Sequence, residues 1–137
     1  MENKIFIESD TKRQVIDVTS DLTEIIRKES RNGIVYFQLP HTTAALIICE
    51  DDIELRADIV RITEKWLADL RPFMHIKNNN PNTEAHVLSA LFGTTVVVPI
   101  TKGMLELGTY QKILLLEMDG PKKREIRLKV IGSSIDE

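Results

Sequence analysis

With 137 residues, of which 42% are hydrophobic and 28% charged, the chain is long enough to bury the core of one domain. Its 18 basic and 21 acidic residues are mixed along the sequence and give a net charge of −3, which argues against nucleic acid as a main partner. The single Cys49 excludes an intrachain disulfide and indicates a reducing compartment. Because no apolar leader or run of about 18 apolar residues is present, we expect a cytoplasmic protein without membrane contact.

The first third of the chain predicts four strands and one helix. Apolar residues at helical spacing indicate a helix that begins at Ser20 or Asp21, and Gly33 is expected to end it in a left-handed turn. Alternation, or a dense run of β-branched and aromatic residues, indicates the strands. These strands are expected over 4–9, 14–18, 34–39 and 44–49.

The clearest expected helix follows Asp51, which forms a capping pair with Glu54. Pro72 is expected to stop the chain from continuing as a helix beyond it. Steps of three or four residues place five apolar side chains on one stripe of this helix. These residues are Leu55, Ile59, Ile62, Trp66 and Leu70.

An Asn- and Pro-rich loop at 77–82 then leads into a short helix, which Asn82 or Thr83 can cap and Gly93 can close. Strands at both ends of the chain with helices between them indicate one α+β domain over residues 1–137. We expect a curved sheet or sandwich with two to three helices on one side. Its last strands are expected over 94–100, 104–108, 112–118 and 125–131.

Three histidines, His41, His75 and His86, are the first candidates for chemistry. The chain has no dinucleotide fingerprint, no phosphate-binding P-loop and no nucleophile elbow, which excludes the enzymes that depend on them. The histidine spacings match no compact metal signature, but three imidazoles brought together by folding would form an open zinc site. The alternative is that they are separate loop histidines.

Two groups of charged residues allow both a functional and a structural interpretation. Asp51 and Asp52 suit the start of a helix, which leaves Glu50 as the candidate ligand or orienting group. Glu117 and Asp119 lie on one face of a strand or at a hairpin end. Three basic residues follow and can bind a phosphate or form a solvated turn. They are Lys122, Lys123 and Arg124.

Several ordered motifs together resemble one known family. They are "PHTTA" (40–44), Glu50, His75, "NTEAH" (82–86), "SALFG" (89–93), "LGTYQ" (107–111) and "EMDGPKKR" (117–124). Their order is similar to that of the YjbQ-like family, which is associated with secondary thiamine phosphate synthase activity. The resemblance covers about residues 5–132.

This resemblance implies a YjbQ-like α+β fold with a curved β-sandwich or barrel-like sheet that assembles as a homotrimer and binds a small phosphorylated molecule. It also implies a polar pocket where the histidine motifs converge. The chain departs from the family pattern at four positions, and the loss of a lysine at Leu88 weakens the case for an anionic substrate. The other departures are Glu84 for Asp, Tyr110 for Trp and Lys122 for Arg.

On this resemblance the first hypothesis is a thiamine phosphate synthase, which joins a pyrimidine pyrophosphate to a thiazole phosphate and expels pyrophosphate. His41, His75 and His86 would bind a divalent metal or the phosphate, with Glu50 or Glu84 as further catalytic candidates. Three histidines suit zinc better than magnesium, the usual partner of pyrophosphate. The expected substrate-binding residues are Thr42, Thr43, Asn82, Thr109, Gln111, Asp119 and Arg124.

Two other functions stay open on the sequence. One is a metal-dependent hydrolase in which a histidine-bound metal activates water and a carboxylate acts as base. The other is a noncatalytic trimeric module that binds a small anion.

Overall fold

The computed structural model describes residues 3–75 and 82–134. Three α-helices occur in this part of the chain, α1 (Thr19–Glu29), α2 (Ile53–Lys65) and α3 (Thr83–Phe92), with one 3₁₀ helix, η1 (Ala68–Leu70). The strands are β1 (Lys4–Glu8), β2 (Gln14–Asp17), β3 (Arg31–Gln38), β4 (Ala44–Cys49), β5 (Thr95–Thr101), β6 (Met104–Leu105), β7 (Lys112–Glu117) and β8 (Lys123–Ser134).

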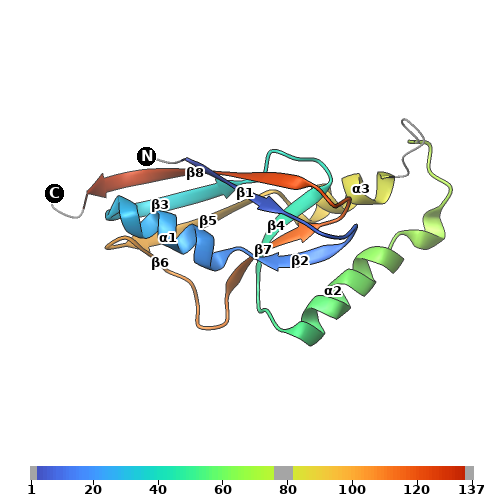
Figure 1. Cartoon of the computed structure of the whole chain (residues 1–137), viewed down its shortest axis with the longest axis horizontal. Helices are drawn as coiled ribbons and strands as arrows, with labels where there is room; N and C mark the ends of the chain where they lie inside the picture. The colour runs from blue at the N-terminus through green and yellow to red at the C-terminus, as the bar shows by residue number, and fades with distance from the viewer. Residues whose placement is uncertain (1–2, 76–81, 135–137) are drawn as a thin grey trace.

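The strands form two antiparallel sheets (Figure 1). The larger sheet has the order β1-β8-β3-β5-β6 and curls into a half-barrel, and the smaller one has the order β2-β7-β4. Their strands come from both ends of the chain, and the helices lie between them in sequence. The expected α+β fold with a curved sheet and helices is therefore confirmed.

The main core lies between the inner face of the five-stranded sheet, α1 and the second sheet. Leu22 and Ile26 of α1 are fully buried there against Phe37 of β3 and Ile126 of β8. Burial of each such side chain contributes roughly 1.5–3 kcal/mol relative to an exposed one. Alternate residues of β1, β3 and β8 point away from this core, so the outer face of the larger sheet carries polar side chains together with exposed apolar ones such as Phe6, Ile34 and Ile131.

Gly33 has a different role from the expected one. Helix α1 ends at Ser30, which adopts the left-handed conformation with φ of 47°. Gly33 instead lies in β3 directly opposite Gly132 of β8. A Cβ atom at Gly33 would lie 2.1 Å from the carbonyl oxygen of Ile131, so this crossing of two strands requires glycine.

Helix α2 differs from the prediction at its start and along its stripe. Asp52, not Asp51, caps it by accepting a hydrogen bond from the amide of Leu55 at 2.7 Å. The helix ends at Lys65, and the second half of the predicted stripe stays 49–66% exposed because α2 turns a different face to the core, with Thr63 and the following Leu67 buried. These exposed residues are Ile62, Trp66 and Leu70.

Helix α3 follows the predicted loop, of which only Asn82 lies within the described residues. Gly93 ends this helix, as expected, with φ of 93°. Ser89 of α3 donates a hydrogen bond to the carbonyl oxygen of Ala44 at 2.6 Å, which ties the helix to β4. Across the described ranges, no helix is both long and apolar enough to cross a membrane.

Candidate functional site

Some of the predicted site residues lie in two polar clusters, and the others lie apart from both. The first, called here the closed cluster, consists of Ser9, Thr43, Glu117 and Arg124, all of them buried. The Nε of Arg124 donates to Glu117 Oε1 at 2.8 Å, and one Nη group also contacts this carboxylate. That same Nη2 donates to the hydroxyl and carbonyl oxygens of Thr43 at 2.9 and 3.2 Å. The guanidinium is thus occupied by partners of its own chain.

The carboxylate of Glu117 is equally well satisfied. Burial disfavours its charged form, but hydrogen bonds from Arg124, Ser9 and the amide of Asp119 outweigh burial and hold the pKa of Glu117 below its usual value. The Ser9 hydroxyl donates to it at 2.7 Å. The segment that contains Ser9 and Thr11 passes close to the backbone of Gly120. A Cβ atom at Gly120 would lie 2.4 Å from the carbonyl oxygen of Thr11, so only glycine allows this approach. This arrangement is typical of a structural ion pair.

His41 completes the pairing of β8. The β3–β8 register ends at Gln38, and continuing it would place Pro40 opposite Glu125. Instead, the Nε2 of His41 accepts a hydrogen bond from the amide of Glu125 at 2.9 Å. Burial, followed by the nearby charge of Arg124, lowers the pKa of His41 and favours the neutral ring that can accept this bond.

The other candidates from the first and last motifs lie apart or serve local contacts. Asp119 is buried and binds the ammonium group of Lys122 at 2.8 Å. Gln111 accepts a hydrogen bond from the amide of Gly108 at 2.7 Å within the loop between β6 and β7. That loop projects from the molecule far from α3 (Figure 1). Three candidates are exposed without a recorded side-chain hydrogen bond: Thr42, Glu50 and Thr109.

The second cluster, called here the arginine pocket, forms around Glu84 at the start of α3. The Nε of Arg71, which follows η1, contacts Glu84 Oε1, and Nη2 of Arg13, in the turn before β2, lies 3.5 Å from Glu84 Oε2. The Glu84 side chain is only 7% exposed, whereas that of Arg71 is 59% exposed. The contact with Glu84 raises the pKa of Arg71 above its ordinary value. Glu84 therefore orients two guanidinium groups that come from distant parts of the chain.

This pocket has the size and the charge of a binding site. Its cavity of about 390 Å³ lies in the range of small-molecule sites. Lys12, Arg13 and Arg71 line it with Glu84 as the single carboxylate, which leaves an excess of two positive charges. Within the described ranges, Nη1 of Arg13 is buried and has no hydrogen-bond acceptor, and the amide oxygen of Asn82 nearby in sequence has no donor. Such unpaired buried groups cost about 1–3 kcal/mol each unless a ligand or water satisfies them.

Two of the three histidines meet beside this pocket. The rings of His75 and His86 pack edge to face with their centroids 5.1 Å apart, and His75 lines the cavity. Thr83 fixes the backbone here, since its hydroxyl donates to the carbonyl oxygen of His75 at 2.6 Å. His41 is engaged with β8 instead.

The predicted three-histidine metal site is wrong. In residues 3–75 and 82–134, no group of three or more His, Cys, Asp or Glu side chains could hold a metal ion. The physical reason is that His41 accepts a hydrogen bond from the amide of Glu125, while Glu84, the buried carboxylate of the helix that carries His86, is paired with two arginines. The expected zinc or magnesium is not tested by this result and stays a prediction.

Sequence reasoning also missed the basic residues of the arginine pocket. Arg13 lies between two expected strands and Arg71 directly before Pro72, positions that suit ordinary solvated turns. The one available signal was Glu84, an acidic residue in the first turn of a helix. Its arginine partners lie 13 residues away or farther, at distances that no local pattern reveals.

Comparison with known families places this geometry in context. A family model described as "UPF0047 protein YjbQ-like" matches residues 3–133. The chain belongs to the YjbQ-like UPF0047 family. A UPF0047 protein of Archaeoglobus fulgidus is 39% identical over 118 residues, which cover 86% of this chain and 91% of that protein. A UPF0047 protein of Methanothermobacter thermautotrophicus is 33% identical over 120 residues, or 87% and 83% of the two chains.

Solved structures of YjbQ-like proteins share the fold. A hypothetical protein of Aeropyrum pernix superposes with a TM-score of 0.89 at 33% identity, covering 97% of this chain and all of that one. A YbjQ-like protein of unknown function from Sulfolobus solfataricus gives a TM-score of 0.87 at 28% identity, covering 96% of both chains. The half-barrel with a second sheet is thus the architecture of this family.

The expected thiamine phosphate synthase with a three-histidine metal pocket is contradicted. The relatives and solved structures compared above are named as UPF0047, hypothetical or unknown-function proteins, and no name among them gives that activity. The described residues also provide no metal-binding group. The function must therefore be inferred from the arginine pocket itself.

Proposed function

We propose that this YjbQ-like chain binds a small phosphorylated molecule in the arginine pocket. The observation that carries the proposal is the convergence of Arg13 and Arg71 on Glu84 in a cavity of about 390 Å³. Guanidinium groups present fixed pairs of donors that match phosphate oxygens. Glu84 contacts only Nε of Arg71 and Nη2 of Arg13, so among the described residues the other guanidinium donors can reach a ligand.

Charge supports phosphate over a single carboxylate. A phosphate monoester carries a charge of about −1.5 to −2 near neutral pH. That charge offsets the excess of two positive charges in the arginine pocket, whereas one carboxylate would offset half of it. The buried Nη1 of Arg13 supplies a donor that lacks an acceptor among the described residues.

The remaining lining of the cavity indicates which group is attached to the phosphate. Pro72 and Phe73 form an apolar wall, and His75 lies at the same cavity. An apolar or flat group joined to the phosphate can pack on this wall, and the ring of His75 can form a hydrogen bond with the ligand. The proposed ligand is therefore a phosphate monoester of a small, partly apolar molecule.

Titration calorimetry with phenyl phosphate tests the proposal. We expect Arg13→Gln and Arg71→Gln each to raise the dissociation constant by about tenfold or more, because each removes a charged hydrogen-bond donor worth roughly 1.5–3 kcal/mol. Benzoate, which offers the same ring with one negative charge, should bind more weakly than phenyl phosphate.

The matched control is Arg61→Gln, which removes an exposed arginine of α2 whose recorded partner is Asp58 at 3.8 Å. This variant should bind as the wild type does. Equal weakening by Arg61→Gln, or no binding of phenyl phosphate to the wild type at millimolar concentration, would overturn the proposal. Melting temperatures of all variants check that the fold is intact.

The homotrimer implied by the family resemblance stays a prediction. Native mass spectrometry of the purified chain tests it: three copies per particle would support it, and a monomer or dimer would contradict it. The proposed phosphate site uses residues of one chain and does not depend on the result.

A further inference from the structure

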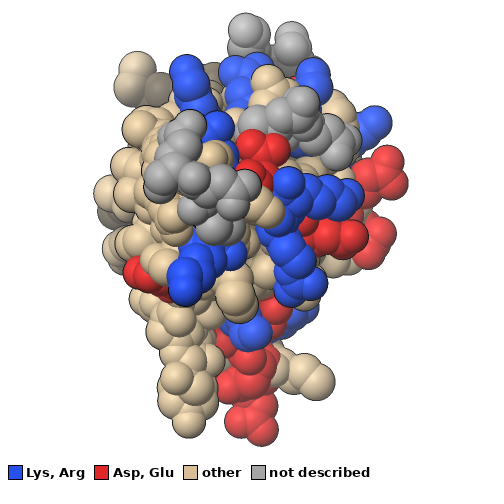
Figure 2. All heavy atoms as spheres, turned by 90° about the vertical axis from the view of Figure 1, so that its left-hand side faces the viewer, with Lys and Arg blue, Asp and Glu red and all other residues tan. Residues whose placement is uncertain are grey.

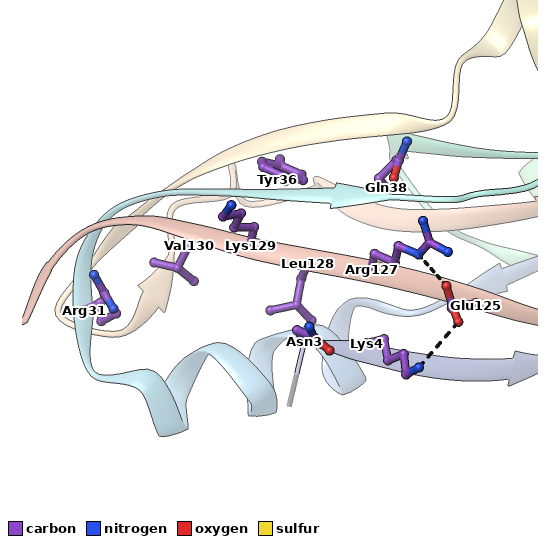
Figure 3. Close-up of a pocket in the computed structure, with 10 residues that line it drawn as sticks. All are labelled: Asn3, Lys4, Arg31, Tyr36, Gln38, Glu125, Arg127, Leu128, Lys129 and Val130. Carbon is purple, nitrogen blue, oxygen red and sulfur yellow. Dashed lines mark hydrogen bonds and ion pairs between the residues drawn. The ribbon is translucent and has the colours of Figure 1, made fainter. Parts of the chain in front are cut away.

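The outer face of the five-stranded sheet carries a second hollow, distinct from the arginine pocket. Helix α1 packs on the inner face, so the outward side chains of β1, β3 and β8 have no helix over them (Figure 1). The hollow measures about 650 Å³. Figure 3 shows its charged lining, which consists of Lys4, Arg31, Glu125, Arg127 and Lys129.

The charges of this hollow do not balance. Glu125 accepts a hydrogen bond from Nε of Arg127 at 2.6 Å and lies 4.0 Å from the ammonium group of Lys4, so two bases share one carboxylate (Figure 3). Lys129 has no carboxylate partner among the described residues. Counted over the described residues that line the hollow, four basic side chains and one acidic side chain leave an excess of three positive charges, in a chain whose net charge is −3. A negatively charged ligand would be attracted to this hollow and would reduce the repulsion among its bases.

The register of the sheet gives this excess a regular geometry. Lys129 lies opposite Tyr36, and Arg127 lies opposite Gln38. Each of these two basic residues therefore has a neutral hydrogen-bonding side chain next to it on the adjacent strand, on the same face of the sheet (Figure 3). The two bases are two residues apart on β8, which corresponds to roughly 7 Å along a strand.

We propose that this hollow, the sheet-face site, binds a small molecule with two anionic groups, phosphate or carboxylate, about 7 Å apart. Arg127 and Gln38 hold one group, and Lys129 and Tyr36 hold the other. A small ligand is favoured over nucleic acid because acidic side chains are interspersed with the basic ones at the end of the molecule where both termini lie (Figure 2). Nucleic acid requires many contacts to successive phosphates along a basic track.

Amide chemical shifts and calorimetry test the site with tripolyphosphate for the phosphate class and glutarate for the carboxylate class. The shifts should move first at Tyr36, Gln38, Arg127 and Lys129. Lys129→Gln and Arg127→Gln should each raise the dissociation constant of the tighter probe by about tenfold, as expected for loss of one charged hydrogen bond. Orthophosphate, with one anionic group, should bind more weakly than tripolyphosphate.

Lys123→Gln is the matched control, because Lys123 lies on the same face of β8 but outside the hollow, 4.6 Å from the ring centre of Phe6. It should leave binding at the four amides unchanged, and reading the affinity from these shifts separates the sheet-face site from the arginine pocket. The sheet-face site is wrong if Lys123→Gln weakens binding as much as Lys129→Gln, or if neither probe shifts the four amides at millimolar concentration. Binding of orthophosphate at these amides as tight as that of tripolyphosphate would contradict two-point recognition.

Discussion

The closed cluster and the arginine pocket contain the same chemical groups but differ in how many of their hydrogen-bond donors have partners within the chain. Each joins a buried glutamate to arginine. In the closed cluster Glu117 and Arg124 form their hydrogen bonds with each other and with Ser9, Thr43 and backbone amides. In the arginine pocket one arginine is mostly exposed, and a second keeps a buried donor without an acceptor among the described residues.

This difference separates structure from function more reliably than residue type does. A buried ion pair whose donors and acceptors are all satisfied has no group left for a ligand, and it joins distant strands. An ion pair at the wall of a cavity, with donors left over, is arranged for an anion. Arg124, the arginine within the most suggestive motif, is bonded to Glu117 and Thr43, whereas Arg13 and Arg71, which belong to no motif, line the candidate site.

Neutralising Glu117 should have the largest effect, and it tests whether the closed cluster stabilises the fold. Glu117→Gln leaves the charge of Arg124 buried without its carboxylate, and the free energy of unfolding should fall by about 3–5 kcal/mol. Urea unfolding followed by circular dichroism measures this. Replacing both residues by leucine should recover a large part of the loss, because an apolar pair leaves no buried charge. A loss below about 1 kcal/mol for Glu117→Gln would show that the closed cluster is not structural.

The same substitution in the arginine pocket should have a smaller effect. Glu84→Gln removes the charge between Arg13 and Arg71, but Arg71 is largely solvated and keeps its hydration. We expect the free energy of unfolding to fall by less than half of the change expected for Glu117→Gln, in the same urea experiment. An equal or larger fall would mean that both clusters mainly stabilise the fold.

The smallest expected effect is a dependence of stability on pH through His41. Its pKa is lowered in the folded state, so its contribution is fully present above the unfolded pKa of about 6.5 and is lost as the pH falls through the lowered folded value. Protonation removes the acceptor for the Glu125 amide, worth about 1 kcal/mol. Between pH 7 and 5 the wild type should lose more stability than His41→Gln, measured by urea unfolding. Equal losses would show that His41 is not the titrating group.

Much of the fold could be predicted from local patterns. The strands around Val35 and Leu46 were expected because dense β-branched and apolar residues suit buried strands, and α3 was correctly ended at Gly93. The errors occurred where a residue type serves two purposes. Gly33 can end a helix or allow two strands to touch, and only the position of Gly132 on a distant strand selects the second.

The candidate site was less predictable for the same reason. His75 and His86 were singled out and do meet, and they lie only eleven positions apart in the sequence. His41 was grouped with them by residue type, yet the end of the β3–β8 pairing gives it a backbone partner instead. Arg13 and Arg71 had no local signal at all.

The sequence by itself determined the family, the α+β class and most element positions, since these depend on ordered motifs and on apolar periodicity within short segments. Only the tertiary structure decided which charges are satisfied and which are left over. That outcome depends on strands and turns up to about a hundred residues apart that meet after folding, as Ser9 and Glu117 do, and no local pattern records which partner each charged side chain finds.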